Sequence, residues 1–568
     1  MSLFNNVVIP KVRKSFHNLS YENKLSFDMG DLVPVYTENV VPGDRFRVNT
    51  EVFLRFAPML APIMHRVNCY VHYFFVPYRL IWDDWKDFIT GGEDGLLQPV
   101  FPKYRLFGKY CAPGQLGDFL GYNFSTDLSS ETTSKSGGEY SLLDFRAYQL
   151  IYNEYYRDQN LTPAVQFSKA SGNSQSTDVL ISGTDYDSLS ADIALAELMT
   201  LRKRAWEKDY FTSALPFVQR GVAAQIPFGD PSISGSGISN IYQIQNSEDY
   251  QVAVKNGSTS DDLDFDPNNV IPNYEITSGG SIVRNGSRAI LAQQGQPNRI
   301  NLNGSHGVSV NDIASKLQLD GLTAPTINEL RLSNHIQKWL EINARVGSRY
   351  IEQILGHYGV RVPDYRLDRP EYLGGGKSPV QISEVLQTSS TDDITPQGNM
   401  SGHAYAVGNK NKFKYTFDEH GIVLGIMSVL PRTSYQQGMS RFHTKFDKFD
   451  HYFPEFAHLG EQDIKEEELW CSYAAANQET NKSTFGYQER YAEYKYRSSE
   501  VHGDFRTSLD FWHLGRKFEN KPELNTSFVE SNPSKRIWAV QDGAHLWCYA
   551  YNSVASVRPI PKHSIPSL

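Results

Sequence analysis

The sequence predicts a mainly β fold, an antiparallel β-sandwich with long loop and helical insertions. Two features predict it. Segments with the apolar pattern of strands occur near both ends of the 568-residue chain, as in a sandwich closed by its termini. The chain is also rich in aromatic and turn-forming residues, with 33 Tyr, 31 Phe, 42 Gly and 28 Pro. This composition suits pleated, half-buried surfaces joined by many turns.

The strand prediction begins with residues 44–57, where apolar and polar side chains alternate. One face carries Phe46, Val48, Val52, Leu54 and Phe56, and the other carries Arg45, Arg47, Asn49, Glu51 and Arg55. A period of two indicates a strand with one buried side. Residues 66–77 are apolar on both faces, which is typical of a strand inside a sandwich. Residues 411–430 predict further strands, and residues 536–557 predict a hairpin around Asp542 and Gly543.

Helical periodicity interrupts these strands. Residues 82–89 predict a short helix with Trp82, Trp85 and Ile89 on one face, and further helices are expected at 141–156 and 191–209. The clearest pattern covers 324–360, where Thr326 and Glu329 form a capping-box signature and Gly359 stands where the helix would end. Long polar stretches separate these helices, so we interpret them as insertions in a single domain that covers residues 1–568.

Residues 231–310 differ from their surroundings. Of these 80 residues, 31 are Gly, Ser or Asn, and Asn-Gly-Ser tripeptides begin at Asn256, Asn285 and Asn303. Asn-Gly is a strong hairpin signal, and the tripeptides separate short alternating segments. A linker would not carry such segments, so we expect a folded, β-rich surface protrusion rather than disorder.

The charge of the chain limits its relation to nucleic acid. A net charge of -9 argues against a dedicated nucleic-acid binder, although it leaves room for a local basic lining. The N-terminal arm, residues 1–26, carries Lys11, Arg13 and Lys14 before any acidic residue, with Phe4 and Phe16 nearby. Charge and stacking could bring such an arm to DNA. A solvated tail or an arm that clasps a neighbouring subunit explains the same residues.

The motifs of common enzymes are absent or incomplete, and we expect no catalytic site and no cofactor. The segment EYLGGGKSP ends like a phosphate-binding loop, but Glu371 replaces the required first glycine and would repel phosphate. The histidines His443, His451 and His458 match no ligand spacing, so loop packing is expected there and no metal site. The four cysteines contain no CxxC pair, which favours packed thiols.

No apolar stretch is long enough to enter a membrane, and the first residues lack the core of a signal peptide. We therefore expect a soluble protein made in a cytoplasm, without membrane insertion.

Five stretches resemble the major capsid protein of microviruses, most closely its gokushovirus branch. They are the block from FDMGDLVPVYTENVVPGDRF to FFVPYRLIW, WEKDYFTSALPFVQRG, the block from TINELRLSNHIQKW to RPEYLGGGKSPV, FGYQERYAEYKYRSSEVHGDFR, and WHLGRKF. They run in the family's order and cover about half of the chain. A stretch as long as RPEYLGGGKSPV, in register with the others, is far more specific than any short motif.

The resemblance implies a single eight-stranded viral jelly roll and sixty copies in a T=1 icosahedral shell around circular single-stranded DNA. It places a large projecting insertion where residues 231–310 lie, and host attachment is the role we expect for it. Expected partners are the chain itself, the packaged DNA, scaffolding and DNA pilot proteins, and a host receptor. The expected location is the virion, assembled in the host cytoplasm. Besides the arm, we predict that four residues line the interior or an interface: Arg490, Tyr491, Tyr494 and Arg497.

Two other classes of protein share parts of this pattern. A phage or bacterial β-sandwich adhesin that binds surface glycans would have the same aromatic, turn-rich composition. A β-rich hydrolase with an active site assembled from distant carboxylates would escape a motif search. Closed shells or pentamers of the expressed protein are expected only for the capsid interpretation.

Overall fold

The computed structural model describes residues 13–124, 134–176, 178–180, 191–222, 326–386, 388 and 400–563, together with nine short strands between residues 232 and 320. The chain forms two compact units. The larger comprises Met1–Gly221 with Leu340–Leu568, and the smaller comprises Val222–Trp339.

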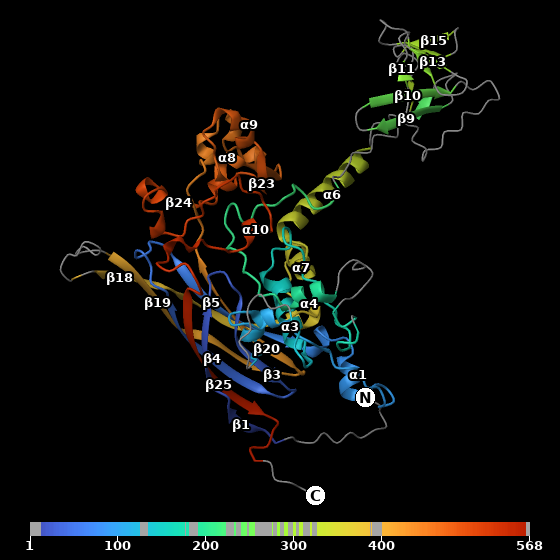
Figure 1. Cartoon of the computed structure of the whole chain (residues 1–568). Coiled ribbons are helices and arrows are strands. Elements are labelled where there is room, and N and C mark those ends of the chain that lie inside the picture. The colour runs from blue at the N-terminus through green and yellow to red at the C-terminus, as the bar shows by residue number, and fades with distance from the viewer. Residues whose placement is uncertain are drawn as a thin grey trace. The chain divides into compact units, whose positions relative to one another are not determined.

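Two antiparallel sheets form the centre of the larger unit (Figure 1). The six-stranded sheet has the order β1–β25–β4–β19–β18, with β2 also paired to β25. Its strands are β1 (Ser15–Asn18), β2 (Tyr21–Phe27), β4 (Arg45–Phe56), β18 (Gln381–Leu386), β19 (Met400–Thr416) and β25 (Leu546–Arg558). The four-stranded sheet has the order β17–β5–β20–β3. Its strands are β3 (Val33–Val40), β5 (Val67–Pro77), β17 (Glu371–Pro379) and β20 (Gly421–Pro431).

The inner faces of the two sheets pack against each other. One apolar cluster joins residues of both sheets, among them Phe46, Leu54, Tyr73, Val423 and Ala550. Strands from the first 80 residues pair with strands from the second half of the chain in both sheets, as in a jelly roll. The predicted mainly β, antiparallel sandwich is therefore confirmed. The two sheets hold ten strands in the part of the chain that the structure describes, and β1 and β2 pair with successive parts of β25.

The sheets differ in what covers their outer faces. Strand β4 alternates between buried and exposed residues along its length, as predicted, because only its inner face is covered. Strand β20 is buried at every residue and β5 at all but one. A second apolar cluster explains this, because it packs Phe74, Ile422 and Leu424 against α3 (Leu143–Ile151). The two central strands of the four-stranded sheet are thus covered on both sides, whereas the six-stranded sheet keeps one face open.

A polar network crosses the sandwich core. The Thr50 hydroxyl donates to Asn552 Oδ1 at 2.6 Å, and Asn552 Nδ2 donates to the Val35 carbonyl at 3.0 Å. The Tyr73 hydroxyl donates to Thr50 Oγ1. Burying these groups is tolerated because each has a partner, and the network links β3, β4, β5 and β25 in one register.

Two local predictions were wrong. The hairpin around Asp542 and Gly543 does not form, because residues 535–537 make a short 3-10 helix and β25 begins only at Leu546. Both edges of β25 are already paired, one with β4 and the other with β1 and β2. The helix predicted at 82–89 begins at Trp85, so Trp82 precedes it, and Ile89 is 52% exposed instead of facing the core.

The other helices follow the predicted positions with shorter bounds. Helix α3 continues into a π-helix at Tyr152–Tyr156, and α4 covers only Ala191–Met199. The predicted helical segment contains α6 (Ile327–Val346) and α7 (Tyr350–Tyr358). Thr326 and Glu329 form the capping box, and Gly359 ends α7 in the left-handed conformation with φ +67°.

The smaller unit contains short strands that pair with one another. The described pairs are a hairpin of β9 (Asn240–Asn246) and β10 (Asp249–Lys255), a meander of five strands, and β8 (Ser232–Ser234) with β16 (Gln318–Asp320). The meander comprises β11 (Glu275–Ile276), β12 (Ser281–Val283), β13 (Ala289–Ala292), β14 (Arg299–Leu302) and β15 (His306–Ser309). None of these described strands pairs with a strand of either large sheet.

Residues 434–529 form loops with little regular structure (orange to red in Figure 1). Their elements are short: β21 (Ser434–Tyr435), β22 (Glu461–Lys465), α8 (Glu466–Leu469), α9 (Gln478–Asn481), β23 (Thr484–Glu489), β24 (Ser499–Glu500) and α10 (Thr526–Val529). A third apolar cluster, which includes Phe211, Ile464 and Phe485, forms the core on which these loops pack.

Candidate functional site

A surface of exposed aromatic and apolar side chains lies on the loops 439–459 and 494–496. We call it the aromatic surface. Its members are Met439, Phe442, Phe446, Phe449, Tyr452, Phe453, Leu459, Tyr494 and Tyr496, all at least 41% exposed. Phe446 is 90% exposed. Contiguous apolar patches of this kind mark interaction sites on soluble proteins.

Five of these rings contact neighbouring rings and form a layer of two groups: Phe442, Tyr452 and Tyr494 around Tyr491, and Phe449 and Phe453 around Phe456. The ring centroids of Phe442 and Tyr494 are 5.2 Å apart, and those of Tyr452 and Tyr491 are 5.0 Å apart. Phe449 and Phe456 are 5.4 Å apart. Most of these pairs are edge-to-face, the arrangement that aromatic rings prefer. The layer is therefore an ordered surface, not a set of loose side chains.

A buried ion pair fixes the loop beneath this layer. Lys445 Nζ lies 2.6 Å from Glu493 Oε1, and the two side chains are 2% and 7% exposed. Gln462 Nε2 donates to the other carboxylate oxygen at 2.7 Å. Burial opposes ionisation of Glu493, but the hydrogen bonds from Lys445 and Gln462 outweigh it and lower its pKa. The ammonium group also lies 4.0 Å from the centre of the Tyr494 ring, a cation–π contact.

A second pair, with a buried carboxylate and a partly buried arginine, anchors the start of the loop. Arg441 Nη1 lies 3.0 Å from Glu468 Oε1, and the Tyr210 hydroxyl donates to Glu468 Oε2 at 2.9 Å. Burial raises the pKa of Glu468, although Arg441 opposes the shift. Together the two pairs anchor a loop whose regular structure is limited to three short 3-10 helices, at Arg441–His443, Lys448–Asp450 and Pro454–Phe456.

The predicted residues 490–497 belong to this region. The Tyr491 ring is 3% exposed, and its hydroxyl donates to the His451 carbonyl at 3.2 Å, so it packs within the loop. Arg490 Nη2 donates to the Phe449 carbonyl at 3.3 Å. Tyr494 is part of the aromatic surface, and Arg497 is exposed beside Glu500 at 3.5 Å. The sequence alone did not show that residues 439–459 join them, although aromatics at every third or fourth position were a visible signal.

The predicted basic arm is only partly described. Lys11 lies outside the described residues. Arg13 and Lys14 are exposed, and Lys14 Nζ donates to the Gly43 carbonyl beside the start of β4. The structure thus brings Lys14 to the six-stranded sheet and brings residues 490–497 to the aromatic surface. The two predicted groups do not form one site.

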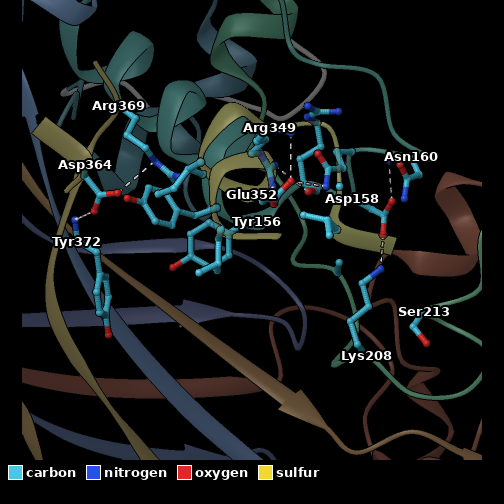
Figure 2. A pocket seen from close by; sticks show the side chains of 18 of the residues that line it. Tyr156, Asp158, Asn160, Lys208, Ser213, Arg349, Glu352, Asp364, Arg369 and Tyr372 are labelled. Carbon is cyan, nitrogen blue, oxygen red and sulfur yellow. Dashed lines mark hydrogen bonds and ion pairs between the residues drawn. The ribbon is translucent and has the colours of Figure 1, made fainter. Parts of the chain in front are cut away.

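A cavity of about 1130 Å³ lies over the outer side of β5 and β17. Its basic residues are Arg157, Arg204, Lys208, Arg345, Arg349, Arg361 and Arg369, and its acidic residues are Asp158, Glu207, Glu352 and Asp364. Figure 2 shows Arg369 directed towards Asp364 and Lys208 towards Asp158. Arg349 lies 3.2 Å from Glu352. Each of these carboxylates has a cationic partner, but seven basic residues face four acidic ones, so the cavity keeps an excess of three positive side chains.

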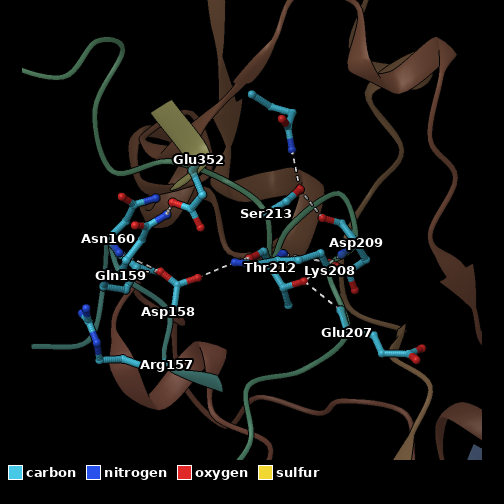
Figure 3. A network of polar contacts seen from close by, with 12 residues as sticks. Arg157, Asp158, Gln159, Asn160, Glu207, Lys208, Asp209, Thr212, Ser213 and Glu352 are labelled. Carbon is cyan, nitrogen blue, oxygen red and sulfur yellow. Dashed lines mark hydrogen bonds and ion pairs between the residues drawn. The ribbon is translucent and has the colours of Figure 1, made fainter. Parts of the chain in front are cut away.

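The polar network in the cavity joins separate segments (Figure 3). Asp158 accepts a hydrogen bond from the backbone N–H of Asn160 at 3.0 Å and forms an ion pair with Lys208. The Gln159 side chain donates to the Glu352 carboxylate at 2.7 Å. Ser213 donates its hydroxyl to the Asp209 carbonyl, so it has no adjacent base to activate it. The network joins α7 to the loop at 157–160 and so stabilises the fold.

The glycine run in EYLGGGKSP lies in strand β17 and not in a loop. A Cβ on Gly375 would lie 2.3 Å from the Val71 carbonyl oxygen, and a Cβ on Gly376 would lie 2.2 Å from Asn411 Oδ1. The glycines therefore allow close approach of β17 to β5 and β19. Their backbone groups are paired with β5 and not arranged to bind phosphate.

Two further searches concern the residues that the structure describes. No group of three or more His, Cys, Asp or Glu side chains there could hold a metal ion. No helix there is both long and apolar enough to cross a bilayer.

Exposed aromatic side chains gathered on one part of a β-sandwich mark a surface that another molecule covers. The family model described as capsid protein (F protein) matches residues 6–568. The chain is 34% identical to capsid protein VP1 of Chlamydia phage 1, over 100% of this chain and 97% of that protein. It is 35% identical to capsid protein VP1 of Bdellovibrio phage phiMH2K, over 98% and 96%, and 27% identical to that of Spiroplasma virus 4, over 100% and 97%.

The chain therefore belongs to this family of phage capsid proteins. Its role is structural, as a component of the virion that assembles with copies of itself into a shell, and it is not an enzyme.

Proposed function

We propose that sixty copies of this chain form a T=1 icosahedral shell around a circular single-stranded DNA genome. The observation that carries the proposal is the aromatic surface. Two ion pairs, Lys445 with Glu493 and Arg441 with Glu468, anchor the loop that carries most of its nine exposed side chains, so this loop is already folded before any partner arrives. In a closed shell of identical subunits the same surface is covered in every copy, which removes it from water.

The test is the effect of one exposed ring on assembly. Phe446 is 90% exposed, so Phe446→Ser leaves the subunit core unchanged. Burial of a phenyl ring contributes about 2 kcal/mol, which corresponds to a roughly 30-fold rise in the concentration needed for assembly when it is lost. Phe446→Tyr retains the ring and serves as the control. Sedimentation velocity and negative-stain microscopy measure particle formation, and unchanged assembly of Phe446→Ser would contradict the proposal.

Host attachment is the role proposed for residues 231–310, as an outward protrusion. In support, the described strands of this window pair only with strands of the smaller unit. A segment whose strands pair only with one another can change in sequence and length without disturbing the sheets of the sandwich. Loops on a rigid scaffold commonly carry binding specificity, and copies grouped around a symmetry axis would add their weak contacts. A host receptor is therefore the proposed partner of this window.

The remaining proposals concern the interior and assembly. The arm with Lys11, Arg13 and Lys14 points inward, and scaffolding and DNA pilot proteins assist assembly in the host cytoplasm. The arm proposal draws support from the exposure of Arg13 and Lys14 at the edge of the six-stranded sheet. The alternative, a β-sandwich adhesin for surface glycans, has no observation that favours it over the family's capsid role.

A further inference from the structure

We propose that the open face of the six-stranded sheet is a binding platform for single-stranded DNA. We call it the basic sheet face. It consists of the outward-pointing residues of β1, β2, β25, β4 and β19, which the strand register places in rows. This inference rests on the proposed enclosure of single-stranded DNA and names the surface that would contact it.

Cations dominate this face. Six of its residues are basic: Lys24, Arg45, Arg47, Arg55, Lys412 and Lys414. The strand register places Arg47 between Lys414 and Ala555, and Asn49 between Lys412 and Ser553. Only Glu22 and Glu51 are acidic. The face therefore carries a net positive charge on a chain whose total charge is -9.

Five of these six cations have no ion-pair partner among the described residues: Arg55, which lies over the Phe53 ring, and a group of four on β4 and β19. Arg45, Arg47, Lys412 and Lys414 are exposed neighbours on β4 and β19, and no described carboxylate lies within ion-pair distance of them. By contrast, Lys24 lies 3.4 Å from Glu22. Unpaired cations in a cluster repel one another, and a polyanion removes that repulsion while its counterions are released.

Aromatic rings stand among the cations on the same face. They are Phe16, Phe53, Tyr405, Trp547, Tyr549 and Tyr551. Trp547 is 49% exposed, and Tyr549 pairs across the sheet with Phe53 on one side and Lys24 on the other. The Arg55 guanidinium lies 5.1 Å from the Phe53 ring centre. Exposed rings beside cations are what sequence-independent single-strand binders use, because every base can stack on a ring while its phosphate meets a cation.

The charge distinguishes this face from the aromatic surface. A protein partner of mainly apolar character would leave five unpaired cations buried, which costs free energy. Duplex DNA would keep its bases paired and could not use the rings. Strand β1 adds a further ring to this face, because it places Phe16 there, two residues after the exposed Lys14.

The experiment uses dissociated full-length subunits and a fluorescein-labelled 30-nucleotide poly(dT). The test variant combines Arg45→Gln, Arg47→Gln, Lys412→Gln and Lys414→Gln. The control removes the same number of charges from exposed residues elsewhere, by Lys86→Gln, Arg366→Gln, Lys482→Gln and Arg506→Gln. Each lost phosphate contact lowers the slope of log affinity against log salt by about 0.7, so the slope of the test variant should fall by about 3. Affinity at fixed salt should fall at least tenfold for the test variant and less than threefold for the control.

Equal losses in the two variants would overturn the inference. Circular dichroism verifies that the test variant is folded, and a second measurement needs no variant. Ultraviolet cross-linking of DNA-filled wild-type particles should join DNA to peptides of β4 and β25 that contain Phe53, Trp547 or Tyr549. Cross-links that map only to other peptides would also overturn it. Particles that contain no single-stranded DNA would refute the proposed function, whereas DNA-filled particles without these cross-links would refute only the platform.

Discussion

The buried ion pair beneath the aromatic surface gives a quantitative prediction. Replacing Lys445 with Met keeps the volume of the side chain and removes its charge. Glu493, 7% exposed, then keeps the hydrogen bonds from Gln462 and from its own backbone N–H but has no cation beside it in the pair. Breaking one partner of a buried pair typically costs 3–5 kcal/mol, because the remaining charge has lost both water and partner. We therefore expect Lys445→Met to lower the free energy of unfolding by about 3 kcal/mol or more.

Urea unfolding of dissociated subunits, followed by tryptophan fluorescence, measures this change. The double variant Lys445→Met with Glu493→Leu removes both charges and should regain most of the lost stability, since an apolar pair of similar volume can replace a buried ion pair. The Lys445→Met subunit should also form shells poorly, because its aromatic surface is no longer fixed.

The pH dependence has a definite sign. The folded pKa of Glu493 is lowered, so its stabilising contribution is present above the unfolded pKa and is lost as pH falls through the folded value. The difference between wild type and Lys445→Met should therefore be largest at neutral pH and shrink in acid. A single variant within 1 kcal/mol of wild type, or a double variant no more stable than the single, would refute the reasoning.

Four further predictions follow from the structure. Replacing residues 232–308 with a short Gly-Ser bridge should leave folded subunits and abolish adsorption to the host, measured by circular dichroism and binding to cells; aggregation would show that the window is part of the core. Gly375→Ala should destabilise the subunit by about 2 kcal/mol, because its Cβ would meet the Val71 carbonyl oxygen; an unchanged melting temperature would contradict this. Asn552→Ala should cost about 1–3 kcal/mol in urea unfolding, because Thr50 and Val35 lose a buried partner. Burial raises the pKa of Glu466 to about 7, so Glu466→Gln should stabilise the subunit by roughly 1–3 kcal/mol at pH 8 and have little effect at pH 4, and equal effects at both would count against it.

The sequence predicted the strands best where one face is open to solvent. In β4 the alternation of Phe46, Val48 and Leu54 with arginines reads directly as a half-buried strand. It also identified β5 and β20, but not the second apolar cluster that buries their outer face, because that cluster comes from distant segments. The false hairpin at Asp542 has the same origin. Its turn signal is local, whereas β25 is held by strands from the start of the chain.

The binding surfaces needed the three-dimensional register. Arg45 and Arg47 were visible as the polar face of one strand, but Lys412, Lys414 and Trp547 join them only through pairing across hundreds of residues. The aromatic surface was also hidden, because the spacing of aromatics at every third or fourth position does not show that these rings are exposed or that the two loops meet. The charged residues that hold it rigid, Lys445 and Glu493, lie 48 positions apart.

An electron cryomicroscopy reconstruction of purified particles tests the central claim most directly. The account predicts an icosahedral shell with one chain per asymmetric unit, so sixty copies of a 64.4 kDa chain with a protein mass of about 3.9 MDa. Each copy should bury its aromatic surface against a neighbour and turn its basic sheet face towards the enclosed DNA. A particle of another symmetry, or a shell in which Phe446 and its neighbours remain exposed to solvent, would contradict it.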